Sequence, residues 1–263
     1  MSSLSFTLIQ SVLYWEDKQA NLKMFEEKIN QLEGKIQVVV LPEMFSTGFS
    51  MKPELLAESM DGPTVEWMKK MASAKKIILT GSLMIESEGH YYNRLVWMLP
   101  NGNFGYYDKR HLFAYGEEDQ HYTMGFERLI TSVNGWKVNT MVCYDLRFPV
   151  WSRQQFREDG SFEYDVLVYV ANWPERRNTA WKTLLQARAI ENQCYVIGLN
   201  RVGDGNGIYY SGDSMVIGPL GEILYQKEHE EDIFTITLER QQLDDARNKF
   251  PFWRDADRFS ILP

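Results

Sequence analysis

Two stretches of this chain are almost entirely apolar, residues 36–41 and residues 166–170. A strand of this composition has to be covered on both faces, which points to a sheet that is buried between other layers. Segments with apolar residues at helical spacing flank them, over residues 17–32, from Pro63 onward and over residues 179–193. This alternation predicts an α/β protein with a large mixed sheet or a pair of sheets.

Turn signals mark the shorter elements. Asn101-Gly102 and Asn134-Gly135 each separate two β-prone runs and predict hairpins. Helices are predicted over residues 149–156 and 239–250, and Gly34 is expected to cap the first helix of the chain.

No linker, repeat or low-complexity tract interrupts the 263 residues, so we expect one domain over residues 1–263. The tail over residues 251–263 is rich in apolar side chains and is expected to dock, either on its own domain or at a subunit interface. The formal charge of −8 and the scattered basic residues argue against a nucleic acid or an anionic membrane as partner.

Cysteine and histidine usage narrows the chemistry. The two cysteines, Cys143 and Cys194, exclude a disulfide framework and fit a reducing cytoplasm.

The N-terminus lacks the layout of a signal peptide, and no apolar run reaches membrane-spanning length. The four histidines show no paired ligand spacing, so no metal site is expected.

Cys143 stands where a chain can present a nucleophile. An apolar strand ends there, and Pro149 can begin a helix shortly afterwards. A sharp turn between strand and helix lifts the side chain off the sheet and aims the next backbone N–H, that of Tyr144, at whatever the sulfur attacks. The alternative is a small buried hydrophobe, which is the role we assign to Cys194.

Glu43 and Lys109 occupy places equivalent to that of Cys143, because each directly follows a predicted strand. If those strands are neighbours, the three side chains converge on one pocket. Each of them alone could simply meet solvent at a strand end. Together they supply what acyl transfer needs, namely a sulfur nucleophile, a carboxylate base and a positive charge for the developing oxyanion.

Four groups of residues carry a resemblance to a known family. They are Pro42-Glu43-Met44-Phe45 within residues 41–48, Lys109-Arg110-His111 within residues 107–113, Cys143-Tyr144-Asp145 within residues 143–149, and Asn172-Trp173-Pro174 together with residues 185–193. In this order they resemble the carbon–nitrogen hydrolases of the nitrilase superfamily, over roughly residues 5–240. The resemblance implies a four-layer αββα sandwich that forms a homodimer through helices.

Within that superfamily the chain is most similar to bacterial omega-amidases. These enzymes hydrolyse the terminal amide of 2-oxoglutaramate or 2-oxosuccinamate and release ammonia and a 2-oxo dicarboxylate. The resemblance implies that Cys143 forms a thioester, that Glu43 and Lys109 are catalytic, and that Glu118 is an additional active-site glutamate, with Glu117 as the open alternative. It implies no metal and no organic cofactor.

A small-molecule amide that carries a distal carboxylate needs a cation in the pocket. The candidates are the arginines of nearby predicted loops, Arg147, Arg176 and Arg177. Each could instead be a structural ion-pair partner. The aromatic candidates for the pocket wall are Phe45, Tyr144 and Trp173, with core packing as their alternative.

Other functions remain open at this point. The same Cys–Glu–Lys set could serve a nitrilase or an N-carbamoyl amino acid hydrolase. A protein of another class would use Cys143 as an oxidisable thiol, in non-catalytic binding or redox sensing. A mechanism with His111 or His121 as the base is a further variant. The leading prediction is a hydrolase that acts on carbon–nitrogen bonds other than peptide bonds.

Overall fold

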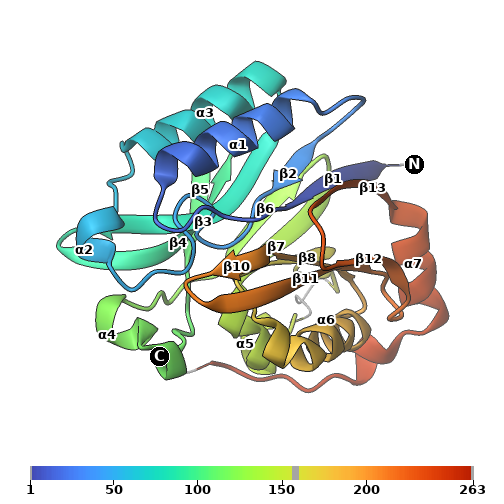
Figure 1. Ribbon diagram of the computed structural model, residues 1–263. Helices are drawn as coiled ribbons and strands as arrows, with labels where there is room; N and C mark the ends of the chain where they lie inside the picture. The colour runs from blue at the N-terminus through green and yellow to red at the C-terminus, as the bar shows by residue number, and fades with distance from the viewer. Residues whose placement is uncertain (1, 156–159, 262–263) are drawn as a thin grey trace.

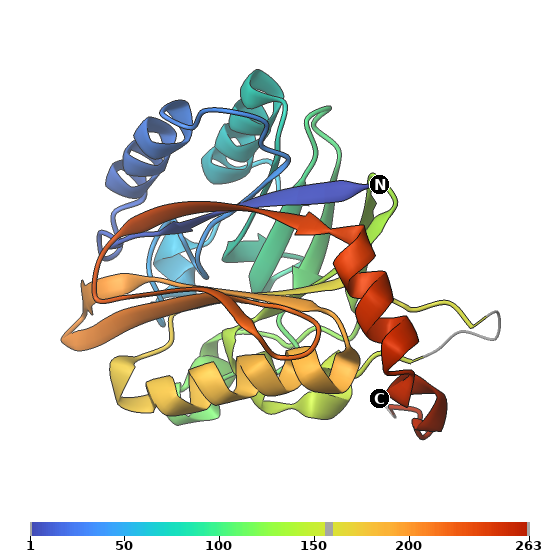
Figure 2. The same cartoon turned by 90° about the vertical axis from the view of Figure 1, so that its right-hand side faces the viewer.

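Two β-sheets pack face to face between two layers of helices in this computed structural model, which describes residues 2–155 and 160–261 (Figure 1). Helices α1 (Lys18–Asn30) and α3 (Pro63–Lys75) cover the outer face of one sheet. Helix α6 (Asn178–Asn192) covers the outer face of the other, and Figure 2 shows the layers from the side. The four-layer αββα sandwich predicted from the sequence is confirmed.

The first sheet has six strands in the order β13-β1-β2-β3-β4-β5. Strands β1, β2 and β3 are parallel, whereas β4, β5 and β13 join antiparallel. The bounds are β1 Ser3–Gln10, β2 Val38–Val40, β3 Ile78–Ser87, β4 His90–Met98, β5 Phe104–Asp108 and β13 Asp232–Glu239.

The second sheet has seven strands in the order β10-β11-β9-β8-β7-β6, and β12 also pairs with β11. Its centre, β7, β8 and β9, is parallel. The bounds are β6 Leu129–Val133, β7 Trp136–Val142, β8 Val166–Ala171, β9 Tyr195–Asn200, β10 Val202–Gly205, β11 Ile208–Ile217 and β12 Ile223–Glu228.

The apolar runs became central strands because both of their faces are covered. Alternate residues of β2 serve different layers: Val38 and Val40 pack between the sheets, and Val39 packs beneath α1 and α3. All residues of β8 are buried. Within the described residues, no helix is long and apolar enough to cross a membrane.

The helix starts follow local chemistry. The Asp17 carboxylate accepts the N–H of Ala20 at the start of α1, and Pro63 is the first residue of α3. The prediction for Gly34 is wrong, because α1 already ends at Asn30 and Gln31 is its cap.

The helix predicted over residues 149–156 is wrong in length. Helix α5 spans only Pro149–Ser152, since Arg153 is extended, and residue 156 lies outside the described residues. A short helix, α2 (Pro53–Leu56), and strand β10 were not predicted.

The C-terminal helix α7 (Arg240–Lys249) lies at the edge of the sandwich, and a short 3₁₀ turn (Phe252–Asp255) follows it (Figure 2). That the tail docks at a subunit interface stays a prediction.

Candidate active site

Glu43, Lys109 and Cys143 follow β2, β5 and β7, but these strands are not neighbours. Strands β3 and β4 separate β2 from β5 in the first sheet, and β7 belongs to the second sheet. The side chains meet because the two sheets face each other, so that strand ends from both sheets reach one region. The three side chains therefore converge as predicted, but they do so across the two sheets of the sandwich and not along the edge of one sheet.

A strained turn presents Cys143. Its φ is +45°, in the left-handed region that residues with a side chain rarely occupy, and a 3₁₀ helix (Cys143–Arg147) begins there. The carboxylate of Asp145 fixes the turn, because it accepts the N–H of Val142 at 3.0 Å and the hydroxyl of Tyr107 at 2.8 Å. The first turn of a helix leaves its backbone N–H groups without intrahelical partners. The backbone N–H of Tyr144 can therefore donate a hydrogen bond to a ligand.

Lys109 joins two carboxylates in the buried interior. Its Nζ donates to Glu43 Oε1 at 2.9 Å and to both oxygens of Glu118, at 3.0 and 2.8 Å. All three side chains are at most 1% exposed. We call Glu43, Lys109, Glu118 and Cys143 the catalytic cluster.

The surroundings of Cys143 favour the thiol over the thiolate. Burial and the charge of Glu43 raise the pKa of Cys143 well above its usual value, although Lys109 opposes them, and the thiol hydrogen-bonds to Glu43. Burial alone would lower the pKa of Lys109, but the charges of Glu118 and Glu43 raise it. These charges favour the ammonium form of Lys109, and the thiol needs a base, for which Glu43 is in place.

Glu118 lies in the catalytic cluster, whereas Glu117 does not. Burial raises the pKa of Glu118, but its carboxylate accepts four hydrogen bonds, two from Lys109, one from Asn93 at 3.0 Å and one from the N–H of Phe113 at 2.6 Å. Such donors favour the ionised form. Glu117 adopts a left-handed backbone conformation and is exposed. The geometry favours Glu118 as the additional glutamate.

Two asparagines complete this network: Asn93 was not singled out in the sequence, and Asn172 was named only as part of a motif, without a role. Asn93 Nδ2 donates to Glu43 Oε1 at 2.8 Å, and the N–H of Asn172 donates to Glu43 Oε2 at 2.7 Å. A signal for Asn93 was available, because asparagine is unfavourable in the middle of a strand unless its amide is used.

The histidines are placed for other roles. His111 Nδ1 lies 2.8 Å from Asp145 Oδ1, and its ring stacks on Phe148 with centroids 3.8 Å apart. His121 ends the short helix α4 (Glu118–His121). The thiol of Cys143 hydrogen-bonds to Glu43. The arrangement therefore favours the carboxylate over a histidine as base.

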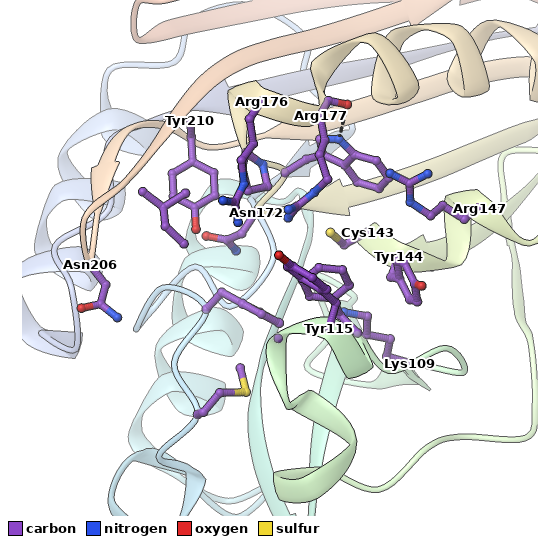
Figure 3. Close-up of a pocket in the computed structure, with 17 residues that line it drawn as sticks. Lys109, Tyr115, Cys143, Tyr144, Arg147, Asn172, Arg176, Arg177, Asn206 and Tyr210 are labelled. Carbon is purple, nitrogen blue, oxygen red and sulfur yellow. Dashed lines mark hydrogen bonds between the residues drawn. The ribbon is translucent and has the colours of Figure 1, made fainter.

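A pocket of about 300 Å³ opens at Cys143 (Figure 3). Tyr144 and Trp173 line it, as the sequence suggested. Phe45 does not: it is buried beneath α1 and α3, with its ring centroid 5.8 Å from that of Phe25. The prediction for Phe45 is wrong, because the turn after β2 points its side chain into the helix-covered core. Other residues of the wall are Phe49, Phe113 and Tyr210, none of which was singled out in the sequence.

Arg147, Arg176 and Arg177 line the same pocket, and we call them the arginine rim. In Figure 3, Arg176 and Arg177 lie above Cys143, and Arg147 lies to its right. The guanidinium of Arg147 lies 4.9 Å from the ring centre of Trp173, and that of Arg177 lies 5.0 Å from the ring centre of Phe113. Among the described residues, none of the three lies within ion-pair distance of a carboxylate. Burial and the charges of Arg176 and Arg147 lower the pKa of Arg177, so the rim is an unneutralised cationic surface.

No group of three or more His, Cys, Asp or Glu side chains that could hold a metal ion occurs in residues 2–155 and 160–261.

The chain matches known proteins over nearly its whole length. The family model described as carbon-nitrogen hydrolase matches residues 6–248. The chain is 43% identical to omega-amidase YafV of Escherichia coli K12, over 99% of this chain and 100% of that protein. It is 32% identical to the 2-oxoglutaramate amidase of Bacillus subtilis, over 89% and 90% of the two chains. A crystal structure from Xanthomonas campestris, described as a CN-hydrolase superfamily protein with an arsenic adduct in the active site, superposes with a TM-score of 0.97 at 42% identity, over 99% and 100% of the two chains.

Proposed function

This chain belongs to the carbon–nitrogen hydrolase family, and we propose that it is an omega-amidase, which releases ammonia from the terminal amide of a 2-oxo dicarboxylic acid monoamide. As a member of that family it is a hydrolase that acts on carbon–nitrogen bonds other than peptide bonds. The observation that carries the proposal is the unneutralised arginine rim beside Cys143 and its buried carboxylate base. The substrates we propose are 2-oxoglutaramate, which the name of the Bacillus subtilis relative contains, and 2-oxosuccinamate, which the resemblance to omega-amidases implies.

The first half-reaction forms a thioester on Cys143. Glu43 takes the thiol proton while the sulfur attacks the amide carbon, and the electrons of the C=O bond move to the oxygen. The N–H of Tyr144 stabilises this oxyanion. The C–N bond then breaks, the nitrogen takes the proton from Glu43, and ammonia leaves.

The second half-reaction restores the thiol. A water molecule gives a proton to Glu43 and attacks the thioester carbon. The C–S bond breaks, and the sulfur takes the proton back from Glu43. The product leaves as a carboxylic acid, which ionises in solvent.

Lys109 acts mainly through its charge in this mechanism. Its three hydrogens already point at Glu43 and at both oxygens of Glu118. A direct hydrogen bond to the oxyanion requires that one of the two bonds to Glu118 be exchanged for it. The ammonium otherwise stabilises the oxyanion electrostatically and holds the two carboxylates in place.

The arginine rim binds the substrate carboxylate at the far end of the pocket. Arg147 and Arg177 suit this role best, because each rests one face on an aromatic ring and keeps the edge of its guanidinium free for a bidentate contact. Arg176 is exposed, and it adds positive charge at the mouth.

The alternative activities are not favoured. The related proteins named above are an omega-amidase and a 2-oxoglutaramate amidase, which supports an amide as the substrate. Ammonia release should be measured with 2-oxoglutaramate, a simple aliphatic nitrile and an N-carbamoyl amino acid. We expect turnover of the first. Turnover of only the other two would reject the omega-amidase proposal.

We further propose a cytoplasmic homodimer. A reducing compartment keeps the nucleophile as a free thiol, which the chemistry requires. Homodimerisation follows from the resemblance to the nitrilase superfamily, and light scattering of the purified protein would test it.

A further inference from the structure

Asn93 lies on β4, next to the edge strand of the first sheet, and Ser82 fixes the orientation of its side chain. Strand β4, which carries it, runs between β3 and β5, and both residues are fully buried. The hydroxyl oxygen of Ser82 accepts the N–H of Met44 at 2.9 Å, and its own hydrogen goes to Asn93 Oδ1 at 2.8 Å. The oxygen of the amide therefore faces Ser82, and its nitrogen must face the catalytic cluster.

The amide nitrogen of Asn93 serves both carboxylates of the catalytic cluster. It has two hydrogens, and it donates to Glu43 Oε1 at 2.8 Å and to Glu118 Oε1 at 3.0 Å. Lys109 donates to the same Oε1 atom of Glu43 at 2.9 Å. Two donors thus occupy both acceptor positions of Oε1.

The other oxygen of Glu43 has one acceptor position to spare. Oε2 accepts the N–H of Asn172 at 2.7 Å. Because a carboxylate oxygen offers about two acceptor positions, the thiol of Cys143 has only Oε2 available to it. The two oxygens of Glu43 are therefore in different situations before any substrate arrives.

We propose that Asn93 is a positioning residue that occupies Oε1 of Glu43 and so reserves Oε2 for proton exchange with Cys143, while Ser82 sets the orientation of Asn93. This inference rests on the proposed role of Glu43 as the base. Neither residue touches the reacting atoms, and Asn93 acts only through Glu43 and Glu118.

The inference has a consequence for pH dependence, because a carboxylate that loses a hydrogen-bond donor is protonated more easily. Without Asn93 we therefore expect the acid limb of the rate profile to move to higher pH. The titratable groups that face Glu43 are Lys109 after β5, Glu118 and Tyr122 from the segment around α4, Cys143 after β7, and Tyr210 of β11. Of these groups, Glu118 also accepts a hydrogen bond from the side chain of Asn93, so Asn93→Ala removes one donor from each of the two carboxylates.

The test compares Asn93→Ala and Ser82→Ala with wild type in two measurements. One is the pH profile of kcat/KM for amide hydrolysis. The other is the pH profile of Cys143 alkylation by iodoacetamide, followed by mass spectrometry, which needs no amide substrate. We expect the plateau of kcat/KM to fall about 10- to 100-fold in Asn93→Ala, as on loss of other supporting contacts, and both acid limbs to move upward. Ser82→Ala should also lower the plateau of kcat/KM and move both acid limbs to higher pH, but by smaller amounts than Asn93→Ala.

Matched controls come from the same chain. Asn139 is a fully buried asparagine of strand β7 whose amide atoms have no partner among the described residues, and Thr80 is a buried hydroxyl two positions before Ser82 with none. Asn139→Ala and Thr80→Val should leave both acid limbs unchanged. Cys194, which is fully buried, should stay unlabelled in every folded variant.

The possible outcomes are distinct. Equal losses of activity at all pH values, with no movement of either limb, would overturn the inference and leave Asn93 a structural residue. A wild-type protein without amide turnover would reject the proposed function, and the alkylation profiles would still test the position of Asn93. If Asn93→Ala fails to fold, which labelling of Cys194 would reveal, Ser82→Ala decides alone.

Discussion

The catalytic cluster and the arginine rim meet at one pocket, which Lys109 and Cys143 line together with the three arginines, but they are built in opposite ways. In the catalytic cluster, charges of both signs are buried and every hydrogen of Lys109 has an acceptor. In the arginine rim, three cations lie together without a carboxylate partner in the described part of the chain. Fixed charges lower the barrier because they need no rearrangement during reaction. Unpaired charges are left free to bind the ligand. We therefore assign the chemical steps to the catalytic cluster and substrate recognition to the arginine rim.

The same difference governs stability. Removing one member of a buried ion cluster leaves an uncompensated charge, which typically costs about 3–5 kcal/mol. Removing one of several crowded cations relieves repulsion and costs little. Substitutions in the catalytic cluster should therefore change turnover and stability, whereas substitutions in the arginine rim should change mainly KM.

The largest effect is expected for Cys143→Ala. Without the sulfur no thioester can form, and kcat should fall by at least about 10⁴-fold. Intact-protein mass spectrometry during turnover should find an acyl group on the wild-type protein and none on the variant. An acyl group that persists in the variant would place the nucleophile elsewhere.

A smaller loss is expected for Glu118→Gln. The change removes one of the two negative partners of Lys109 but keeps the shape of the side chain, so kcat should fall about 10²- to 10³-fold with little change in KM. Glu117→Gln is the matched control, because the neighbouring residue is exposed and lies outside the catalytic cluster. If the two variants were equally impaired, the distinction between these glutamates would fail.

Much of the catalytic cluster could be predicted, because strand ends are visible in the sequence and the chemistry dictates which residue types must meet there. Its supporting contacts could not. Asn93 lies 50 residues from Glu43, and Asn172 lies 129 residues from it. Their contacts depend on how the two sheets approach each other. Phe45 was misplaced for a related reason, since side-chain direction in the turn after β2 is set by packing.

Substitutions in the arginine rim should weaken substrate binding, seen as a higher KM, without slowing the chemical steps. Arg147→Met and Arg177→Met should each raise KM for 2-oxoglutaramate about 10-fold, the worth of one charged hydrogen bond, and leave kcat nearly unchanged. A neutral primary amide of similar length should be hydrolysed equally by variants and wild type. Arg128→Met is the control, because Arg128 is paired with Glu163 at 2.9 Å and does not line the pocket. A loss in kcat rather than KM would assign the arginine rim to the chemistry.

A second ion cluster, around Asp165, lies away from the pocket. Its charges are paired as in the catalytic cluster, but it takes no part in the proposed reaction. Asp165 lies 2.9 Å from both Arg240 and Arg247 of helix α7, and its carboxylate accepts the N–H of Lys137 at 3.0 Å. Burial alone would raise the pKa of Asp165, but the Arg240 and Lys137 bonds and the charge of Arg247 lower it overall.

A group whose pKa is lowered on folding stabilises the protein above its unfolded pKa of about 3.9, and this contribution is lost as the pH falls through the lower folded value. Asp165→Asn should therefore reduce the free energy of unfolding at pH 7, by about 1–3 kcal/mol, the usual cost of losing charged hydrogen bonds. Urea unfolding at pH 7 and near pH 3 should find a smaller difference at the lower pH, while kcat and KM at pH 7 stay unchanged. A deficit that is the same at both pH values would mean that packing, rather than the charge of Asp165, holds α7 in place.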